Sequence, residues 1–176
     1  MREQKLTTPV SKEILASLAC GDEVLINGAI YTARDAAHKA MLKMAQEGEK
    51  LPFDPRGAII YFAGPSPAPP GFPIGSCGPT TSSRMDPFTK TMFELGIAAQ
   101  LGKGPRGKEV IQTLVDFGGV YLVALGGAGA LLAEKVKKAR LLAFPELGPE
   151  AVYELEVENF PAIVAIDSKG NNIFKN

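Results

Sequence analysis

A stretch dense in proline and glycine, residues 64–79, interrupts the chain so fully that neither a helix nor a strand can continue through it. It follows an apolar run at residues 58–63 that predicts a β-strand. It ends shortly before Asp86-Pro87, which predicts a helix start with Asp86 as its cap, because proline is favoured at the first helical position. Long loops in compact domains are usually functional or flexible, and the abrupt helix signal favours an ordered, functional loop.

The segments on either side alternate between strand and helix patterns. Continuous or alternating apolar runs predict strands at residues 23–31, 58–63, 120–125, 152–157 and 163–166, after a short extended segment at 5–10. Capping residues followed by apolar stripes predict helices that begin at Ser11, at Thr32 or Asp35, at Asp86, at Lys108 and at Gly126. The Asp86 helix is expected to run to the glycines at 102–104, and the Gly126 helix to Arg140. This order describes an α/β protein with layered sheets and flanking helices.

Composition limits the function classes. The chain has 176 residues, of which 45% are hydrophobic, so we expect one domain that spans residues 1–176. Its 19 lysines and arginines balance 19 acids, which favours neither nucleic acid nor a membrane surface as a partner. Residues 1–10 are polar, and no segment approaches the roughly 18 apolar residues that span a bilayer. We therefore expect a cytoplasmic protein.

Several common kinds of site are not expected. Cys20 and Cys77 are too few and too far apart for a disulfide framework or a structural zinc site, and His38 is the only histidine. We therefore expect this chain to bind no metal by itself. The glycine run at 126–129 lacks the G-x-G-x-x-G spacing of dinucleotide sites, so we assign it to tight packing of a helix against a strand. A G-x-S-x-G motif is also absent, which argues against hydrolase chemistry.

Residues 78–86, Gly-Pro-Thr-Thr-Ser-Ser-Arg-Met-Asp, carry the strongest functional signal. A rigid turn, hydroxyl groups and the Arg84 guanidinium stand just before a helix start, where backbone N–H groups also attract anions. The alternative is a proline-stiffened turn whose Ser and Thr side chains satisfy local backbone groups. Because so many anion-binding groups occur together, we favour an anion site.

Two more cations are predicted near this segment. Arg34 stands at a strand-to-helix junction, where the helix dipole favours anions. Arg34 and Arg84 together suit two planar carboxylates, so we expect a dicarboxylate ligand. Lys103 stands between two glycines that leave its ammonium group accessible. The alternatives are that Arg34 pairs with Asp35 and that Lys103 is an ordinary exposed lysine.

The motifs also occur in the order of a known family. They are Thr32-Ala33-Arg34-Asp35-Ala36-Ala37-His38, Gly64-Pro65, Gly78-Pro79-Thr80-Thr81 with Arg84-Met85-Asp86, Lys103-Gly104, Gly126-Gly127, and Phe160-Pro161 followed by Asp167 and Gly170. In these motifs, over roughly residues 6–174, the chain resembles the β subunit of class I fumarate hydratases and L-tartrate dehydratases. The resemblance implies a swivelling β/β/α domain.

The resemblance also implies a partner and a cofactor. In this family an α subunit, or an α part of the same chain, carries three cysteine ligands of a 4Fe-4S cluster. Cys20 and Cys77 do not match those ligands, so the cluster is expected on the α subunit and not on this chain. We expect a homodimer or a hetero-oligomer, active only with that subunit.

The resemblance assigns roles to individual residues. Arg34, Arg84 and Lys103 are expected to hold the substrate carboxylates, and Thr80 to touch the reacting centre and transfer a proton. Because a threonine hydroxyl is a poor base, Thr80 would need an acid or a histidine of the α subunit as its partner. Four further residues are expected to contact these side chains without touching the substrate. They are Asp35, His38, Thr81 and Asp86.

These observations predict an iron–sulfur hydro-lyase subunit that acts in the reversible hydration of fumarate to malate. Tartrate, or a related hydroxy diacid, is the alternative substrate. The alternative from another class is a non-catalytic module that binds dicarboxylates.

Overall fold

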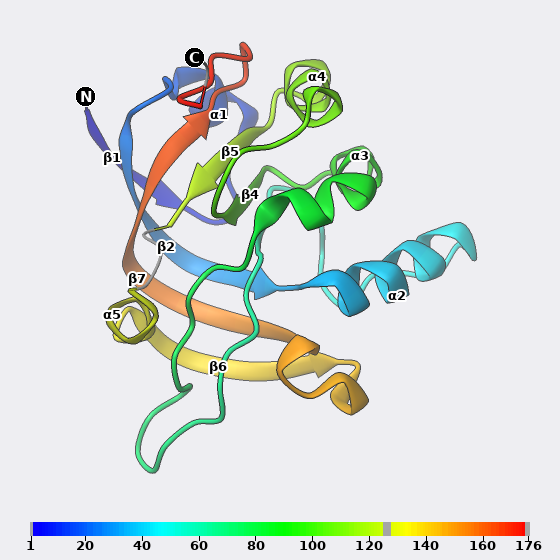
Figure 1. Ribbon diagram of the computed structural model, residues 1–176, viewed down its shortest axis with the longest axis vertical. Coiled ribbons are helices and arrows are strands. Elements are labelled where there is room, and N and C mark those ends of the chain that lie inside the picture. Colours follow the sequence, from blue (N-terminus) through cyan, green and yellow to red (C-terminus); the bar gives the residue numbers. More distant parts are fainter. Residues whose placement is uncertain (1, 125–127, 175–176) are drawn as a thin grey trace.

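A seven-stranded sheet organises the computed structural model, which describes residues 2–124 and 128–174. Its strands are β1 (Glu3–Thr7), β2 (Glu23–Thr32), β3 (Ile59–Tyr61), β4 (Ala99–Gly102), β5 (Val120–Val123), β6 (Val136–Ala143) and β7 (Val152–Ile166). They follow the order β1-β2-β3-β4-β5-β7-β6, and β2 also pairs with β7. The extra pairing closes β2, β3, β4, β5 and β7 into a small barrel-like ring (Figure 1).

The strands β1 to β5 run parallel to one another, whereas β7 runs antiparallel to β2, β5 and β6. Parallel neighbours need long crossover connections, and helices supply them here. Helix α2 (Asp35–Gln46) lies between β2 and β3 in the chain, α3 (Asp86–Glu94) between β3 and β4, and α4 (Lys108–Phe117) between β4 and β5. These three helices cover one side of the ring (Figure 1). The remaining helices are α1 (Lys12–Ser17), α5 (Gly129–Ala133) and the 3₁₀ segments η1 (Ser82–Met85) and η2 (Pro145–Glu150).

The core has two parts because alternate side chains of each strand face opposite ways. In β3, Ile59 and Tyr61 belong to a cluster with Ile30 and Phe160, which come from β2 and β7. Ile60 belongs to the second cluster, which contains apolar residues of α2, α3 and α4. The helices are therefore held on the outer face of β3, β4 and β5. The α/β class predicted from the sequence is confirmed.

The proline-rich loop is ordered by its own hydrogen bonds. Ser66 N–H donates to Ser76 O at 2.9 Å, and Gly75 N–H donates to Ser66 O at 3.0 Å. Cys77 O accepts a hydrogen bond of 2.6 Å from the buried Tyr61 hydroxyl. At the end of the loop Thr80 N–H donates to Phe62 O at 2.7 Å. The loop thus leaves β3, extends away from the sheet (Figure 1) and returns to the strand that it left.

The helix predicted to run from Asp86 to residue 102 is wrong in its second half. Helix α3 ends at Glu94, and residues 99–102 form β4, which is buried along its whole length. Gly96 has a φ angle of +113°, which a helix does not allow. Pairing with β3 and β5 on both sides then outweighs the helix propensity of alanine and leucine in this segment.

The helix predicted from Gly126 to Arg140 is wrong beyond Ala133. Helix α5 covers only Gly129–Ala133, and β6 follows it, paired with β7. Gly126, Gly127 and the end of the strand predicted at 120–125 lie outside the described residues. Gly129 is closely packed, but against the loop and not against a strand as predicted, because a Cβ atom there would lie 3.0 Å from Gly78 N.

The helix starts were predicted more accurately than the ends. Ser11 caps α1, because its Oγ accepts a hydrogen bond from Ile14 N–H. Helix α3 begins at Asp86 as predicted, but its cap residue is Met85 and the Asp86 carboxylate has other partners. Across residues 2–124 and 128–174, none of the helices is both long and apolar enough to span a bilayer.

We expect the ring interior to dominate the stability of the fold. Ile30 is fully buried in β2, so Ile30→Ala should lower the free energy of unfolding by ~2–5 kcal/mol. The matched change Ile14→Ala, at a position that is 39% exposed in α1, should cost about 0.5 kcal/mol or less. Urea denaturation measures both values, and equal losses in the two variants would contradict the assignment of this core.

Candidate functional site

The predicted site residues meet where the parallel strands β2, β3 and β4 end. Hydrogen bonds join the backbone beyond these strands: Ala33 N–H donates to Tyr61 O at 3.0 Å, and Phe62 N–H donates to Leu101 O at 2.8 Å. Arg34 follows β2, the loop that ends at Thr80 follows β3, and Lys103 follows β4. We call this region the carboxyl edge. Ligands of open α/β sheets commonly bind at such an edge.

Arg34 lies at the N-cap position of α2, with its side chain 28% exposed. Its Nε atom lies 3.9 Å from Oε1 of Glu150, which is too long for a hydrogen bond. This buried Nε–H donor has no hydrogen-bond partner among the described residues. Gly64 makes room for the side chain, since a Cβ there would lie 3.3 Å from Arg34 Cδ and 2.9 Å from Pro149 O. Arg34 therefore keeps part of its guanidinium available to a ligand.

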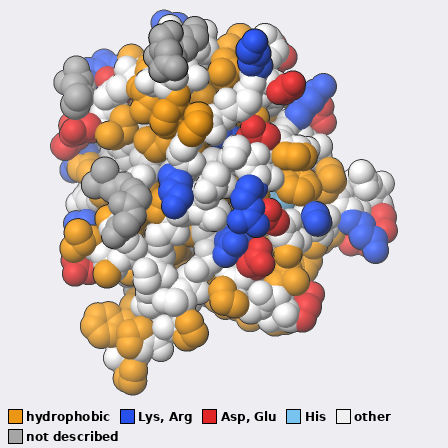
Figure 2. Space-filling view, in the orientation of Figure 1, with side chains coloured by type: hydrophobic (Ala, Val, Ile, Leu, Met, Phe, Trp, Pro, Cys, Tyr) orange, Lys and Arg blue, Asp and Glu red, His pale blue; other side chains and the backbone are white. Residues whose placement is uncertain are grey.

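Arg84, in η1, is bound to Asp35, the residue that follows Arg34. Its Nε–H donates to Asp35 Oδ2 at 3.2 Å, and its Nη2 lies 3.0 Å from Asp35 Oδ1. The Arg84 side chain is still 51% exposed. The pair of Arg34 with Asp35 that the sequence allowed is replaced by this pair of Arg84 with Asp35. The two arginines therefore stand around the same helix start, and Figure 2 shows basic beside acidic side chains on this face, near the start of α2.

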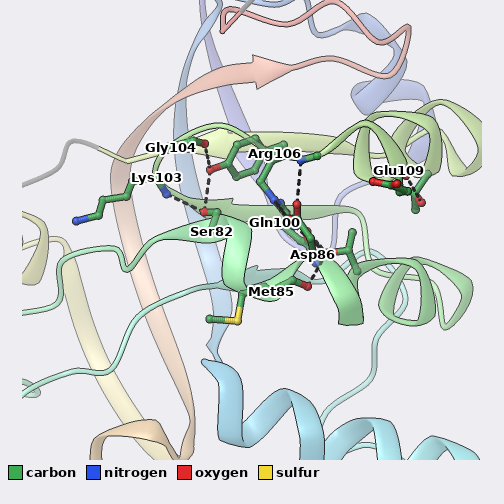
Figure 3. A network of polar contacts seen from close by, with 12 residues as sticks. Ser82, Met85, Asp86, Gln100, Lys103, Gly104, Arg106 and Glu109 are labelled. Carbon is green, nitrogen blue, oxygen red and sulfur yellow. Dashed lines mark hydrogen bonds and ion pairs between the residues drawn. The ribbon is translucent and has the colours of Figure 1, made fainter.

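Thr80, Thr81 and Lys103 are held together by backbone contacts. Thr81 and Lys103 form an isolated parallel bridge, which extends β4 beyond its end. Ser82 N–H donates to Lys103 O at 3.0 Å, and Lys103 N–H donates to Ser82 Oγ at 2.9 Å. The Lys103 side chain is exposed and extends away from these contacts (Figure 3). Thr80 is half-buried beside it, so the hydroxyl of Thr80 and the ammonium of Lys103 are carried by one rigid backbone unit.

Asp86, predicted to support the site, binds an arginine that the sequence did not single out. Asp86 Oδ1 accepts a hydrogen bond of 2.6 Å from Arg106 Nε, and Oδ2 accepts one of 2.9 Å from Gly107 N. The Arg106 side chain is fully buried. Asp86 thus links the start of α3 to the loop after Lys103.

His38 is fully buried in α2 and acts on Arg34 through the backbone. Its Nδ1 lies 2.9 Å from Arg34 O, so Nδ1 carries the proton, because a carbonyl only accepts. The ring packs against Phe62 and Phe88, each with centroids 5.5 Å away. Burial lowers the pKa of His38 to about 4, only partly opposed by the bond to Arg34 O. The imidazole is therefore neutral near pH 7 and fixes the turn that carries Arg34.

With the geometry described, comparison with known proteins decides the family. The family described as "Fumarase C-terminus" matches residues 1–176. The chain belongs to this family. A Methanocaldococcus jannaschii protein, provisionally named L(+)-tartrate dehydratase subunit beta, is 48% identical over 172 residues, which cover 94% of this chain and 88% of that protein.

Fumarate hydratases are also similar to this chain of the fumarase C-terminal family. Fumarate hydratase 2 of Leishmania major is 41% identical over 96% of this chain, and the anaerobic class I fumarate hydratase of Escherichia coli is 39% identical over 93%. This chain spans only 30% and 31% of the lengths of those two proteins. Most of each fumarate hydratase therefore has no counterpart in this chain.

The side chains that could bind a metal ion are scattered over the described residues. These residues contain no group of three or more His, Cys, Asp or Glu side chains that could hold a metal ion. Cys77 is buried, which raises the pKa of its thiol to about 12, and burial likewise raises the pKa of the Cys20 thiol. Cys20 and Cys77 are the only cysteines in the sequence, so this chain offers at most two thiols to a cluster.

Sequence reasoning missed several residues of the carboxyl edge. Ser82 stood inside the Thr-Thr-Ser-Ser run, so its hydroxyl could have been considered with those of its neighbours. Arg106 follows Gly-Lys-Gly-Pro in what read as an exposed loop, and nothing in the sequence signals its burial. Glu150 lies far along the chain and reaches Arg34 only through the position of η2.

His38 gives a direct test of this geometry, because it is the only histidine of the chain. An NMR titration of its ring should show a midpoint near pH 4, below the ordinary value of 6.5. Since the unfolded chain binds the proton more readily, the stability contributed by the neutral ring is complete above pH 6.5 and is lost as the pH falls toward 4. A midpoint at or above 6.5 would show that the ring is not buried as described.

Proposed function

We propose that this chain is the β subunit of an iron–sulfur hydro-lyase that catalyses the reversible hydration of fumarate to malate. In this proposal the chain supplies carboxylate-binding side chains, and a partner subunit completes the active site. The observation that carries the proposal is the placement of Arg34 and Arg84 around one helix start, each beside a carboxylate of the chain itself.

Those carboxylates indicate what the guanidiniums are suited to bind. Asp35 engages Arg84 through two nitrogens, and Glu150 stands near the unpaired Nε of Arg34. A guanidinium offers several donors in one plane, so a substrate carboxylate can bind while Asp35 or Glu150 remains close. A four-carbon dicarboxylate has one such group at each end. Two arginines would then fix the orientation of the carbon skeleton between them.

Thr80 and Lys103 stand where the remaining chemistry is required. In the dehydration direction a proton leaves the carbon next to a carboxylate, and negative charge builds up on that carboxylate. The Arg84 guanidinium and the Lys103 ammonium would stabilise this charge. We assign the proton transfer to the Thr80 hydroxyl, with an acid or a histidine of the partner subunit as the group that takes up its proton.

We place the 4Fe-4S cluster on the partner subunit, because this chain has only two cysteines and neither matches the cluster ligands of the family that it resembles. The lengths of the relatives support this division. The chain covers 88% of a protein named as a subunit beta but about three tenths of the fumarate hydratases, so the remaining part would supply the cluster. In such an assembly the chain would act as a swivelling domain that brings its carboxyl edge to the partner.

Tartrate is the second candidate substrate, and the name of the Methanocaldococcus jannaschii relative favours it. Fumarate and tartrate are both C4 dicarboxylates, so the same two arginines would serve either. The assembled enzyme should therefore be assayed with fumarate, malate and L(+)-tartrate. A chain that binds dicarboxylates alone, and forms no active complex, would instead be a non-catalytic binding module.

Arg84→Ala should lower kcat/KM of the assembled enzyme by at least ~100-fold, because a charge-assisted contact to a carboxylate of the substrate is lost. Arg84→Lys should also be costly, since an ammonium cannot reproduce the two-nitrogen contact. Steady-state hydration of fumarate after anaerobic co-expression with the partner subunit measures both. Arg140→Ala is the matched control. Arg140 lies on β6, pairs with Glu154 of β7, and its side chain is 70% exposed. If Arg84→Ala and Arg140→Ala both turn over at the wild-type rate, Arg84 does not bind substrate.

Thr80 can be tested without changing the volume of its side chain. Thr80→Val removes the hydroxyl and should lower kcat by roughly 10²–10⁴-fold, the usual contribution of a proton-transfer group. Thr80→Ser keeps the hydroxyl and should retain a larger part of the rate. Comparable losses in the valine and serine variants would assign Thr80 a packing role instead.

A further inference from the structure

Arg106 forms a buried network directly behind the carboxyl edge. Its Nε donates to Asp86 Oδ1 at 2.6 Å, its Nη1 to Gln100 Oε1 at 2.9 Å and its Nη2 to Thr89 Oγ1 at 2.7 Å (Figure 3). The three nitrogens of the guanidinium thus have three different partners. These partners lie at the start of α3 and within β4.

Stability alone does not account for such a network. A buried charge carries a desolvation cost, and replacing a buried ion pair with apolar side chains is often neutral or stabilising by ~1–4 kcal/mol. The Arg106 side chain is fully buried and lies against the Phe62 and Tyr121 rings, 5.3 and 4.8 Å from the ring centroids. What the guanidinium adds is a fixed geometry between the segments that it joins.

Those segments are the ones that carry the proposed substrate ligands. Asp86 is two residues after Arg84, and Arg106 is three residues after Lys103. The Asp86 carboxylate also accepts a hydrogen bond of 2.9 Å from Gly107 N, so it binds the Lys103 loop at two points. The Asp86–Arg106 pair therefore adds a second connection between the backbones near Arg84 and Lys103, beside the hydrogen bonds of Ser82 with Lys103.

A second chain of hydrogen bonds fixes Lys103 itself. The Tyr121 hydroxyl lies 2.8 Å from Gly104 O and 2.8 Å from Ser82 Oγ. Since a carbonyl only accepts, the Tyr121 hydroxyl donates to Gly104 O and accepts a hydrogen bond from the Ser82 hydroxyl, whose Oγ in turn accepts from Lys103 N–H. Gly102 allows this approach, because a Cβ there would overlap the Ser82 side chain. Hydrogen bonds to Ser82 and Tyr121 thus hold the backbone of Lys103 and Gly104 against the core.

We propose that Arg106 is a positioning residue, which holds Arg84 and Lys103 at the separation needed to bind one carboxylate of a dicarboxylate whose other carboxylate is bound by Arg34. The functional part of this inference rests on the proposed function. The geometric part can be tested without any measurement of enzyme activity. Displacing a ligand group by about 1 Å can lower a rate ~100-fold, so rigid support behind the carboxyl edge has a large effect on catalysis.

The geometric part is tested by amide hydrogen exchange on the full chain. Arg106→Lys keeps the charge but loses the three-way contact, so exchange at the amides of Ser82, Lys103 and Gly107 should speed up at least tenfold. The control is Arg56→Lys, which changes an 83% exposed arginine paired only with Asp54. Thr89→Val, which removes one acceptor and keeps the volume, should give a smaller change in the same direction, and it replaces Arg106→Lys if that variant does not fold. Unchanged exchange at these amides in the folded variants would overturn the proposal.

The functional part is tested by a double-mutant cycle on the enzyme assembled with its partner subunit. Arg106→Lys alone should lower kcat/KM for the dicarboxylate by roughly tenfold to 100-fold. In a Lys103→Ala background the same change should cost less than in the wild-type background, because one of the two groups that Arg106 positions is already gone. A purely structural role would give equal losses in both backgrounds and would overturn the inference.

The two readouts separate this inference from the proposed function. If the wild-type assembly turns over none of the dicarboxylates, the proposed function fails, and the exchange experiment alone decides whether Arg106 orders the edge. If turnover is normal and exchange speeds up but kcat/KM does not change, Arg106 orders the loop without serving the substrate, which contradicts the inference.

Discussion

The parallel pairing of β2, β3 and β4 is the constraint on which the rest of this structure depends. It brings three chain segments far apart in sequence to one edge, with Arg34, Thr80 and Lys103 just beyond the strands. The closing contact of β2 with β7 keeps that edge in place, because β2 is held on both sides. The helices that follow then add partly unsatisfied backbone N–H groups and a positive dipole end to the same region. An anion site arises there from the backbone arrangement, and the side chains determine which anion fits.

The carboxyl edge is incomplete within the described residues. Arg84 is half exposed, Lys103 extends outward, and the nearest carboxylate to Arg34 is beyond hydrogen-bond range. Exposed ion pairs contribute only about 0–1 kcal/mol, so Asp35 and Glu150 hold the guanidiniums in place without competing strongly for them. Such an edge is suited to be covered by another protein surface, which would exclude water and strengthen every charge interaction. This agrees with a chain that matches about three tenths of the fumarate hydratases.

Local sequence signals predicted the parts of the fold that depend on local chemistry. The Ser11 cap, the start of α2 at Asp35, which was one of two predicted starts, and the order of the loop at residues 64–79 follow from capping, turn and proline rules. The strands β4 and β6 were missed because their pairing with distant strands outweighs helix-forming residues. Arg106 and Glu150 were missed for the same reason, since their partners are set by tertiary packing. The roles assigned to Arg34, Thr80, Arg84 and Lys103 remain predictions, because contacts between protein groups do not test substrate binding.

The central claim is that the two ends of a dicarboxylate are bound by cationic side chains that the parallel strands bring together. A crystal structure of the assembled enzyme with malate bound tests it most directly. We predict that one malate carboxylate lies within hydrogen-bond distance of Arg34, that the other lies within reach of Arg84 and Lys103, and that the Thr80 hydroxyl faces the carbon between them. Malate bound away from the carboxyl edge, or held there without any contact to Arg34 and Arg84, would contradict the claim.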